Sequence, residues 1–320
     1  MMTHYSFGVS GNLVKFPYRE IYYHTLLLEP FLQVPDIQIM ASSILRRFLP
    51  RKTTWMYGQR MMSSTIDVSV DEQTGIALMR MKRKPVNSLN LEFLQDIRNT
   101  IVTLEQNKKC KGLILTSDVP KIFSAGIDIL EMYQPNEERL NSFWRALQDM
   151  WLQLYMTPLA TIAAINGHSP AGGCLISISC DYRIMAPNYT IGLNETLLGI
   201  VAPFWFKDAM CNTVGHREAE IALALGKLYS TEEALQKGLV DEVVTSEQIM
   251  EAAQKKMLEY VKIPNMARAM SKQLMRQETA DKLRSTQDSD VQNFVNFCLQ
   301  DKVQQSLGFY LEQLKKRKSK

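Results

Sequence analysis

Short strand-like runs alternate with longer helix-like runs from residue 66 onward, and this alternation constrains the fold more than any other feature. The runs IDVSV (66–70) and GIALMRM (75–81) flank a turn-rich segment and predict a β-hairpin. Three further runs, GLILTS (112–117), ATIAAI (160–165) and DYRIMA (181–186), are typical of buried strands. Strands that alternate with helices predict an α/β architecture in which helices cover the sheet.

The segments between these strands have the periodicity of amphipathic helices. After Asn90, a residue type that often caps helices, apolar side chains recur every three or four residues, and the stretch 137–156 repeats the pattern. GLVDEVV (238–244) predicts a last short strand, and the sequence after it is almost wholly helical in period. We therefore expect an α/β core over residues 65–245 and a helical C-terminal region over residues 246–320.

The N-terminal residues differ in composition from the rest of the chain. The net charge is +4; residues 40–64 contribute +5, with five Arg or Lys and no acid, and residues 1–39 contribute −1, so residues 65–320 are neutral overall. An acid-free stretch with Arg and Ser that begins at Met40 is typical of a mitochondrial transit peptide, and a basic segment without a targeting role is the alternative. We expect a mature protein in the mitochondrial matrix, with residues 1–39 an upstream extension to which the sequence assigns no role.

Signatures of common cofactor, nucleophile and metal sites are absent from the sequence. It contains no phosphate-binding loop, no GxGxxG after a strand, no HExxH and no GxSxG. The five cysteines are odd in number and lack paired metal-ligand spacing, which is typical of reduced thiols in a non-secretory compartment. No apolar run reaches the length of about 18 residues that a membrane span needs. We expect no bound metal, no cofactor and no membrane span.

Two small-residue turns, each followed by a predicted helix, are candidates for binding a negatively charged oxygen. They are FSAGID (123–128) and NGHSPAGG (166–173). Such a turn leaves backbone N–H groups unpaired at a helix N-terminus, where the macrodipole favours negative charge. Two donors that converge on one carbonyl oxygen would form an oxyanion hole. Glycines also simply make turns, and either segment alone favours that interpretation.

Glu195 is the only charged residue in the ten-residue run IGLNETLLGI (191–200). Its apolar neighbours would remove water from the carboxylate, which raises its pKa and suits it to act first as a general base and then as an acid. By composition alone, Glu195 could equally lie in a surface loop.

The order of these segments resembles the crotonase (enoyl-CoA hydratase/isomerase) superfamily from about residue 66 to the C-terminus. Within it, the sequence is similar to the mitochondrial 3,2-trans-enoyl-CoA isomerases. The runs that carry the resemblance are KPVNSLNLEFL (84–94), GLILTS (112–117), FSAGIDILEM (123–132), AINGHSPAGGCL (164–175), CDYRIMA (180–186), IGLNETLLGIVAPFW (191–205) and DVQNFV (290–295). The resemblance implies a spiral of ββα units, C-terminal helices that pack between subunits, and a homotrimer.

The resemblance also implies roles for particular residues. The backbone N–H groups of Ile127 and Gly172 would hold the thioester oxygen of an enoyl-CoA substrate, and Glu195 would move the proton. The implied reaction is conversion of 3-cis- or 3-trans-enoyl-CoA into trans-2-enoyl-CoA in fatty acid β-oxidation. Other positions that match the family's substrate-binding pocket are Ala125, Gly126, Asp128, Ile129 and Asn194.

Three other functions stay open. Hydratases of the superfamily use a second glutamate, and here Leu175 occupies that position, which disfavours a weak hydratase. A dienoyl-CoA isomerase would need a further acid, for which Asp128 and Glu131 are candidates. The basic tail Lys315–Lys320 could indicate a non-catalytic RNA-binding homologue, but a charge run at a terminus is usually solvated, so we expect no nucleic acid partner.

Overall fold

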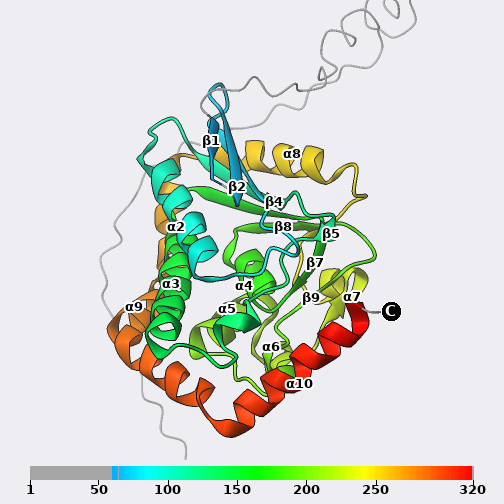
Figure 1. Cartoon of the computed structure of the whole chain (residues 1–320). Helices are drawn as coiled ribbons and strands as arrows, with labels where there is room; N and C mark the ends of the chain where they lie inside the picture. Colours follow the sequence, from blue (N-terminus) through cyan, green and yellow to red (C-terminus); the bar gives the residue numbers. More distant parts are fainter. Residues whose placement is uncertain (1–59, 64, 319–320) are drawn as a thin grey trace, which may run out of the picture. The chain divides into compact units, whose positions relative to one another are not determined.

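The computed structural model describes residues 60–63 and 65–318 (Figure 1), all within one compact unit. The predicted upstream extension, residues 1–39, and most of the predicted transit peptide, residues 40–64, lie outside the described residues. Arg60–Met62 are described, and they form a strand, β1, that pairs with the next strand of the chain.

The main sheet is mixed, and most of its strands are parallel. In the described part of the chain its order is β1-β2-β3-β4-β6-β8-β11. The first three strands are antiparallel, and each later neighbour is parallel. The strands after β1 are β2 (Ile66–Asp71), β3 (Ile76–Met81), β4 (Gly112–Ser117), β6 (Ala160–Ile165), β8 (Tyr182–Met185) and β11 (Glu242–Val243).

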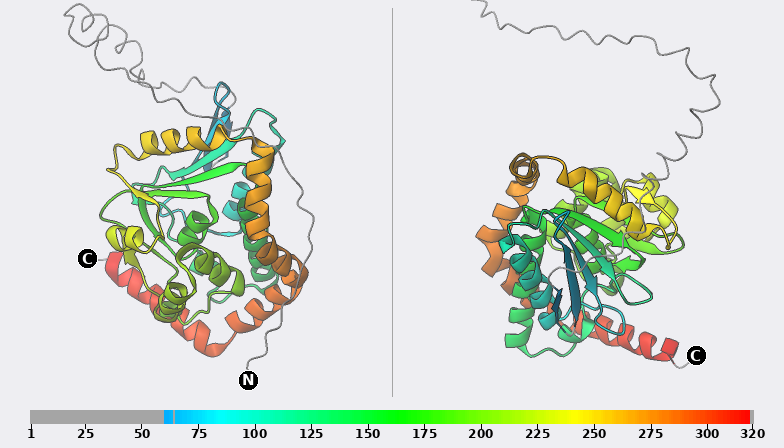
Figure 2. Two further views of the ribbon diagram at one scale, coloured as in Figure 1. Left: turned by 180° about the vertical axis from the view of Figure 1, so that it is seen from behind. Right: turned by 90° about the horizontal axis from the view of Figure 1, so that it is seen from above.

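Helices cover both faces of this sheet, as the α/β prediction requires. Ile249, Ala253 and Met257 of α8 (Ile249–Val261) pack on one face. The other face is buried beneath α2 (Leu91–Gln106), α3 (Glu137–Met156) and α4 (Gly172–Ser179) (Figures 1 and 2). The side chain of Asn90 accepts a hydrogen bond from Phe93 N, so α2 begins at the predicted cap.

The predicted strand 238–244 is wrong in its first half. Leu239 N and Val240 N both donate to Ala234 O, so these residues close the end of α7 (Thr231–Gln236), and only β11 joins the sheet. Gly238, with a φ of +72°, begins this turn in the left-handed region that favours glycine.

A second, smaller sheet, with the order β10-β9-β7-β5, was not predicted. Its strands have only two to four residues and contain Gly, Ser and Pro, so they have no clear strand period. β5, β7 and β9 are parallel to one another, and β10 is antiparallel to β9. The strands are β5 (Lys121–Ile122), β7 (Gly167–Pro170), β9 (Thr190–Gly192) and β10 (Tyr229–Ser230).

The C-terminal region is helical, as predicted. After α8, Pro264 precedes α9 (Asn265–Cys298), which packs against α3. The last helix, α10 (Asp301–Lys318), runs along the lower right edge of the view in Figure 1 (Figures 1 and 2). The remaining helices are α5 (Phe204–Val214), α6 (His216–Leu225) and the short 3₁₀ helices η1 (Ile129–Glu131) and η2 (Glu195–Leu198). None of the described helices is long and apolar enough to cross a membrane.

Candidate active site

The smaller sheet brings the predicted site segments to one edge. Ile122 of β5 pairs with His168 of β7, and Pro170 of β7 pairs with Gly192 of β9, all in parallel register. Because parallel strands end at the same edge of a sheet, the loops that follow them enter one region. These loops hold the FSAGID turn after β5, the start of α4 after β7, and Glu195 after β9.

The two small-residue turns are in direct backbone contact. A Cβ on Gly126 would lie 2.9 Å from Gly172 N, and a Cβ on Gly172 would lie 3.3 Å from Ile127 N. No side chain fits between the turns at Gly126, whose φ of +86° is also left-handed. The N–H groups of Ile127 and Gly172, which are far apart in the sequence, therefore lie next to each other in space.

Both of these N–H groups lack an acceptor among the described residues. On either side of Ile127 the backbone is bonded: Leu89 N donates to Gly126 O at 2.8 Å, and Asp128 N donates to Leu89 O at 3.1 Å. Gly172 is the first residue of α4, so its N–H has no partner within the helix. Two neighbouring N–H donors without an acceptor, one of them at a helix N-terminus, have the chemistry that an oxyanion hole requires.

Ala171 links the second turn to the segment that carries Glu195. Its φ of +50° is unusual for a residue with a Cβ, and such strain is held only where the surroundings fix it. Ala171 N donates to Gly192 O at 2.8 Å, which ties the start of α4 to the end of β9. A Cβ on Gly173 would lie 2.5 Å from Ser124 O, so α4 also begins against the first turn.

Glu195 is a buried carboxylate that faces no counter-charge among residues 60–63 and 65–318. It is 6% exposed, and neither of its carboxylate oxygens has a hydrogen-bond partner in the described part of the chain. Burial raises the pKa of this carboxyl from about 4.5 to about 7. The surface-loop interpretation is therefore wrong, and the carboxyl can both accept and release a proton near neutral pH.

The short helix η2 holds Glu195 in place through contacts with the end of α6. Thr196 Oγ1 donates to Leu223 O at 2.9 Å. A Cβ on Gly226, the left-handed residue that ends α6, would lie 2.7 Å from Thr196 Oγ1 and 2.8 Å from Leu197 Cγ. Because these contacts use the residues after Glu195, its carboxylate stays free for a ligand.

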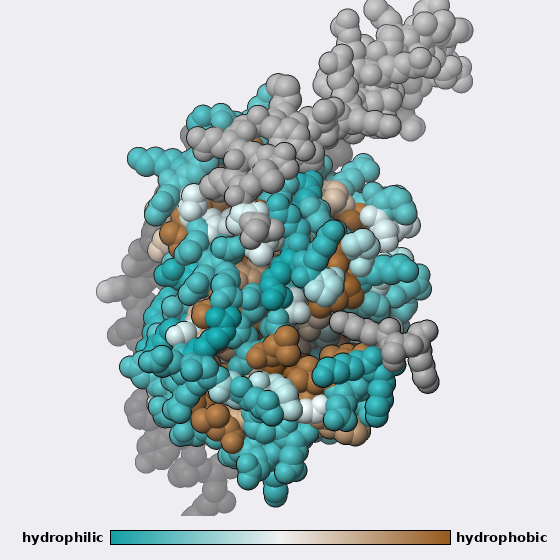
Figure 3. Space-filling model, viewed as in Figure 1, coloured by the Kyte–Doolittle hydropathy of each residue, from teal (hydrophilic) through white to brown (hydrophobic). Residues whose placement is uncertain are grey.

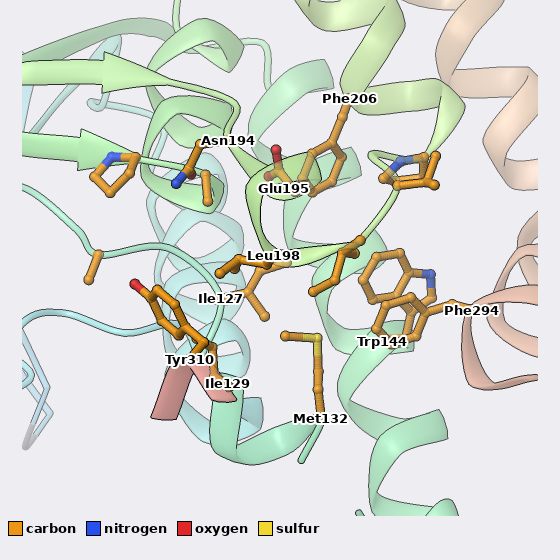
Figure 4. Close-up of a pocket in the computed structure, with 16 residues that line it drawn as sticks. Ile127, Ile129, Met132, Trp144, Asn194, Glu195, Leu198, Phe206, Phe294 and Tyr310 are labelled. Carbon is orange, nitrogen blue, oxygen red and sulfur yellow. The ribbon is translucent and has the colours of Figure 1, made fainter. Parts of the chain in front are cut away.

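Glu195 lines a mostly apolar pocket with a cavity volume of about 70 Å³ (Figure 4). Of the predicted site residues, Ala125, Ile127, Ile129 and Asn194 line the same pocket. Further walls come from α3, α5, α9 and α10 through Trp144, Phe206, Phe294 and Tyr310, which sequence reasoning missed. For Trp144, Phe206 and Tyr310 the only sequence signal is membership of a helical period, which identifies a buried face but not the cavity it faces. Phe294 also lies in the run DVQNFV (290–295), which carries the family resemblance but does not point to the pocket.

The predicted residues Gly126, Gly172 and Asp128 are not among those lining the pocket. The two glycines form the backbone contact behind Ala171 and Ile127. Asp128 pairs with Arg83 at 3.1 Å, and its other oxygen accepts from Leu130 N at 3.2 Å, which caps η1. These bonds give Asp128 a structural role in the turn.

Other carboxylates that could assist Glu195 are engaged elsewhere. Glu131 is 6% exposed, accepts two hydrogen bonds from Arg139, and also accepts from Leu91 N at the start of α2. Leu175 is fully buried on α4 and brings no polar group. Among the described residues that line the pocket, Glu195 is the only carboxylate. No cluster of His, Cys, Asp or Glu that could hold a metal occurs in residues 60–63 and 65–318.

The surface next to the pocket is also apolar. The elements η1, η2 and α10 expose Leu130, Leu197 and Phe309, which are 65–70% accessible. Figure 3 shows apolar side chains on this face of the molecule, in its lower half. An apolar pocket beside two donors and one base suits a ligand with an apolar part and one polar reacting group.

Comparison with known proteins agrees with this geometry. The family profile "Enoyl-CoA hydratase/isomerase" matches residues 71–319. The chain is similar to the mitochondrial enoyl-CoA delta isomerase 1 of Rattus norvegicus, with 50% identity over 262 residues, 81% of this chain and 91% of that protein. For the Homo sapiens protein of the same name, identity is 48%, over 81% of this chain and 87% of that protein.

Solved structures give the same result. The crystal structure of human mitochondrial delta3-delta2-enoyl-CoA isomerase matches with a TM-score of 0.79 and 49% identity, over 80% of this chain and 100% of that one. The enoyl-CoA hydratase from Bacillus halodurans matches with a TM-score of 0.69 and 22% identity, over 77% of this chain and 99% of that one, and supports the fold alone. The crotonase resemblance and fold predicted from the sequence are confirmed, and the chain belongs to the enoyl-CoA hydratase/isomerase family.

Proposed function

We propose that this protein is a Δ3-Δ2-enoyl-CoA isomerase, which moves the double bond of 3-cis- or 3-trans-enoyl-CoA to give trans-2-enoyl-CoA in fatty acid β-oxidation. The observation that carries the proposal is Glu195, a lone buried carboxylate in an apolar pocket beside two unpaired backbone donors. Relatives with about half of their residues identical are named enoyl-CoA delta isomerase, which supports the same activity here.

In the proposed mechanism, Glu195 removes one proton and returns it at another carbon. The ionised carboxylate takes the proton from C2 of the acyl chain, and the electrons move onto the thioester oxygen to form a dienolate. The N–H groups of Ile127 and Gly172 donate to this oxygen, which carries more charge in the transition state than in the substrate. Protonated Glu195 then delivers the proton to C4, and the double bond ends between C2 and C3. No co-reactant is consumed.

The described residues bring no second carboxylate to the pocket, which supports isomerisation over hydration. Hydration needs a group that orients and activates water, and at the position of the second hydratase glutamate this chain has the fully buried Leu175. The proposed dienoyl-isomerase acids are also occupied, because Asp128 pairs with Arg83 and Glu131 pairs with Arg139.

A competition assay tests this function. We expect purified protein to convert 3-enoyl-CoA to 2-enoyl-CoA rapidly, and to add water to 2-enoyl-CoA far more slowly. The measurement is the rate of each product by chromatography when both substrates are supplied. Hydration as the dominant reaction, or no reaction with either thioester, would contradict the proposal.

We further propose that the protein works in the mitochondrial matrix as a homotrimer, after removal of its N-terminus before Arg60. Cleavage there would keep β1, whose residues Arg60–Met62 pair with β2. An exposed apolar stripe on α9, which comprises Met266, Met270, Leu274 and Met275, supports an interface between subunits.

Native mass spectrometry of the protein from isolated mitochondria tests both ideas at once. We expect the subunit mass of a chain that begins at or shortly before Arg60, and an assembly of three such chains. A mature chain that begins after β1 would contradict the cleavage proposal, and a monomer would contradict the trimer.

A further inference from the structure

One end of the pocket is closed by two stacked aromatic rings. The rings of Trp144 on α3 and Phe294 on α9 are parallel to within 7°, with centroids 3.4 Å apart, and both line the pocket. Figure 4 shows them on the opposite side of the pocket from Asn194 and Tyr310, with Met132 and Leu198 also facing the cavity. A hydrocarbon chain that extends from the reacting carbons past Met132 would meet these rings.

Hydrogen bonds and ring contacts fix the indole of Trp144 in its position. Its Nε1 donates to Asp290 Oδ2 at 2.8 Å, and Gln148 Nε2 donates to the same oxygen at 2.6 Å. The indole is 2% exposed and packs edge-on against Trp205, with ring centroids 6.1 Å apart. Trp205 is itself fully buried and packs on Trp151 at 5.0 Å. The described side chains therefore fill the space behind Trp144.

Phe294 has no such backing. Its ring is only partly buried, and it reaches the pocket from α9, a helix with many exposed side chains. The two rings therefore differ in what lies behind them. The Trp144 ring is backed by buried side chains, whereas the Phe294 ring is partly exposed. Removing the Phe294 ring would open the pocket towards the outside of α9, whereas shortening Trp144 would only add space against Trp205.

We propose that the Trp144–Phe294 ring pair sets the longest acyl chain that the enzyme accepts, and that Phe294 is the residue that blocks longer chains. This inference rests on the proposed isomerase function and adds the substrate class, 3-enoyl-CoA thioesters whose tail ends at the ring pair. Asp290 is a positioning residue, because its carboxylate fixes the indole against which Phe294 stacks.

The inference predicts a break in the dependence of kcat/KM on chain length. Each buried methylene strengthens binding about fourfold, so kcat/KM rises with chain length until the tail meets the rings and then falls. For Phe294→Ala we expect the maximum to move to a longer even-numbered homologue. Trp144→Phe should give a smaller shift, because Trp205 and Trp151 still close that side.

The test is kcat/KM for a series of even-numbered 3-enoyl-CoAs, measured with wild type, Phe294→Ala, Phe294→Leu and Phe297→Ala. Phe297 is a matched control, since it is also a partly buried phenylalanine of α9 but does not line the pocket. The milder Phe294→Leu covers the case in which the alanine variant folds poorly, and it should shift the maximum less.

The outcomes separate this inference from the proposed function. A longer optimum in the Phe294 variants and an unchanged optimum in Phe297→Ala would support it. An unchanged optimum in both Phe294 variants, or an equal shift in Phe297→Ala, would overturn it while leaving the isomerase function intact. A wild-type protein that isomerises no 3-enoyl-CoA of any length would instead remove the function on which the inference rests.

Discussion

Replacing Glu195 with glutamine is expected to lower kcat with 3-enoyl-CoA by roughly 10²–10⁴-fold, the usual contribution of a general acid–base group. Glutamine keeps the shape of the side chain but cannot carry the proton from C2 to C4. No other carboxylate lines the described pocket, so nothing can replace Glu195. The effect should be on kcat with KM nearly unchanged, and steady-state kinetics measures both. Near wild-type turnover by Glu195→Gln would contradict the single-base mechanism.

The same substitution is expected to stabilise the protein at alkaline pH. The pKa of Glu195 is about 7 in the folded protein, above the ordinary value of 4.5, so the fold favours the protonated form. The stability that the protonated carboxyl gives to the folded state is fully present below pH 4.5 and is lost as the pH rises through 7. The loss in free energy of unfolding is about 3 kcal/mol at pH values well above 7. Glutamine has no charge to bury, so the variant should unfold at higher denaturant concentration than wild type above pH 7, and the difference should nearly vanish below pH 4.5.

The pH dependence of the wild type supplies a second check. Because the base must be ionised to take the first proton, kcat/KM should fall as the pH decreases below about 7.

Glu131→Gln is the matched control, since Glu131 is equally buried but accepts hydrogen bonds from Arg139 and Leu91. It should lose stability by about 1–3 kcal/mol, retain activity and keep the pH profile. An equal loss of activity in both variants would point to burial, and not to proton transfer, as the cause.

The sequence predicted the main sheet better than the smaller one for a physical reason. The strands β4 and β6 coincide with the runs 112–117 and 160–165, because a parallel strand covered on both faces is apolar throughout. The strands β5, β7 and β9 are held by a few backbone bonds and by close approach of glycines, so they leave no periodic signal. Yet these short strands are the ones that bring the site together.

The same limit applies to the site residues. The apolar neighbours of Glu195 suggested a desolvated carboxylate, but a surface loop fitted the sequence equally well. Only the three-dimensional structure decides that Glu195 is buried. Trp144 and Phe294 are 150 positions apart in the sequence and meet only because α9 packs on α3. Sequence periods describe each helix alone, and contacts between distant helices depend on the tertiary structure.

Replacing Gly172 with alanine is expected to lower kcat/KM by roughly 10²–10³-fold, as the loss of one oxyanion donor does. The new Cβ would lie 3.3 Å from Ile127 N and 2.8 Å from Leu89 Cδ1. Leu89 can move because the contact is with the end of its side chain, but the methyl group remains between the two turns. It would then push the N–H groups of Ile127 and Gly172 out of the geometry in which one oxygen contacts both. Steady-state kinetics with 3-enoyl-CoA measures the loss.

Gly215→Ala is the control that separates this effect from a general loss of stability. Gly215 has φ of +80°, with nothing within 4 Å of an added Cβ, and it does not line the pocket. Strain at this position should cost about 1 kcal/mol or more of folding free energy and leave kcat/KM unchanged. Gly172→Ala should show the reverse, a large loss of kcat/KM with a smaller change in denaturant stability. If Gly172→Ala retained wild-type kcat/KM, its N–H could not be half of the oxyanion hole, and stabilisation of the dienolate would have to come from Ile127 alone.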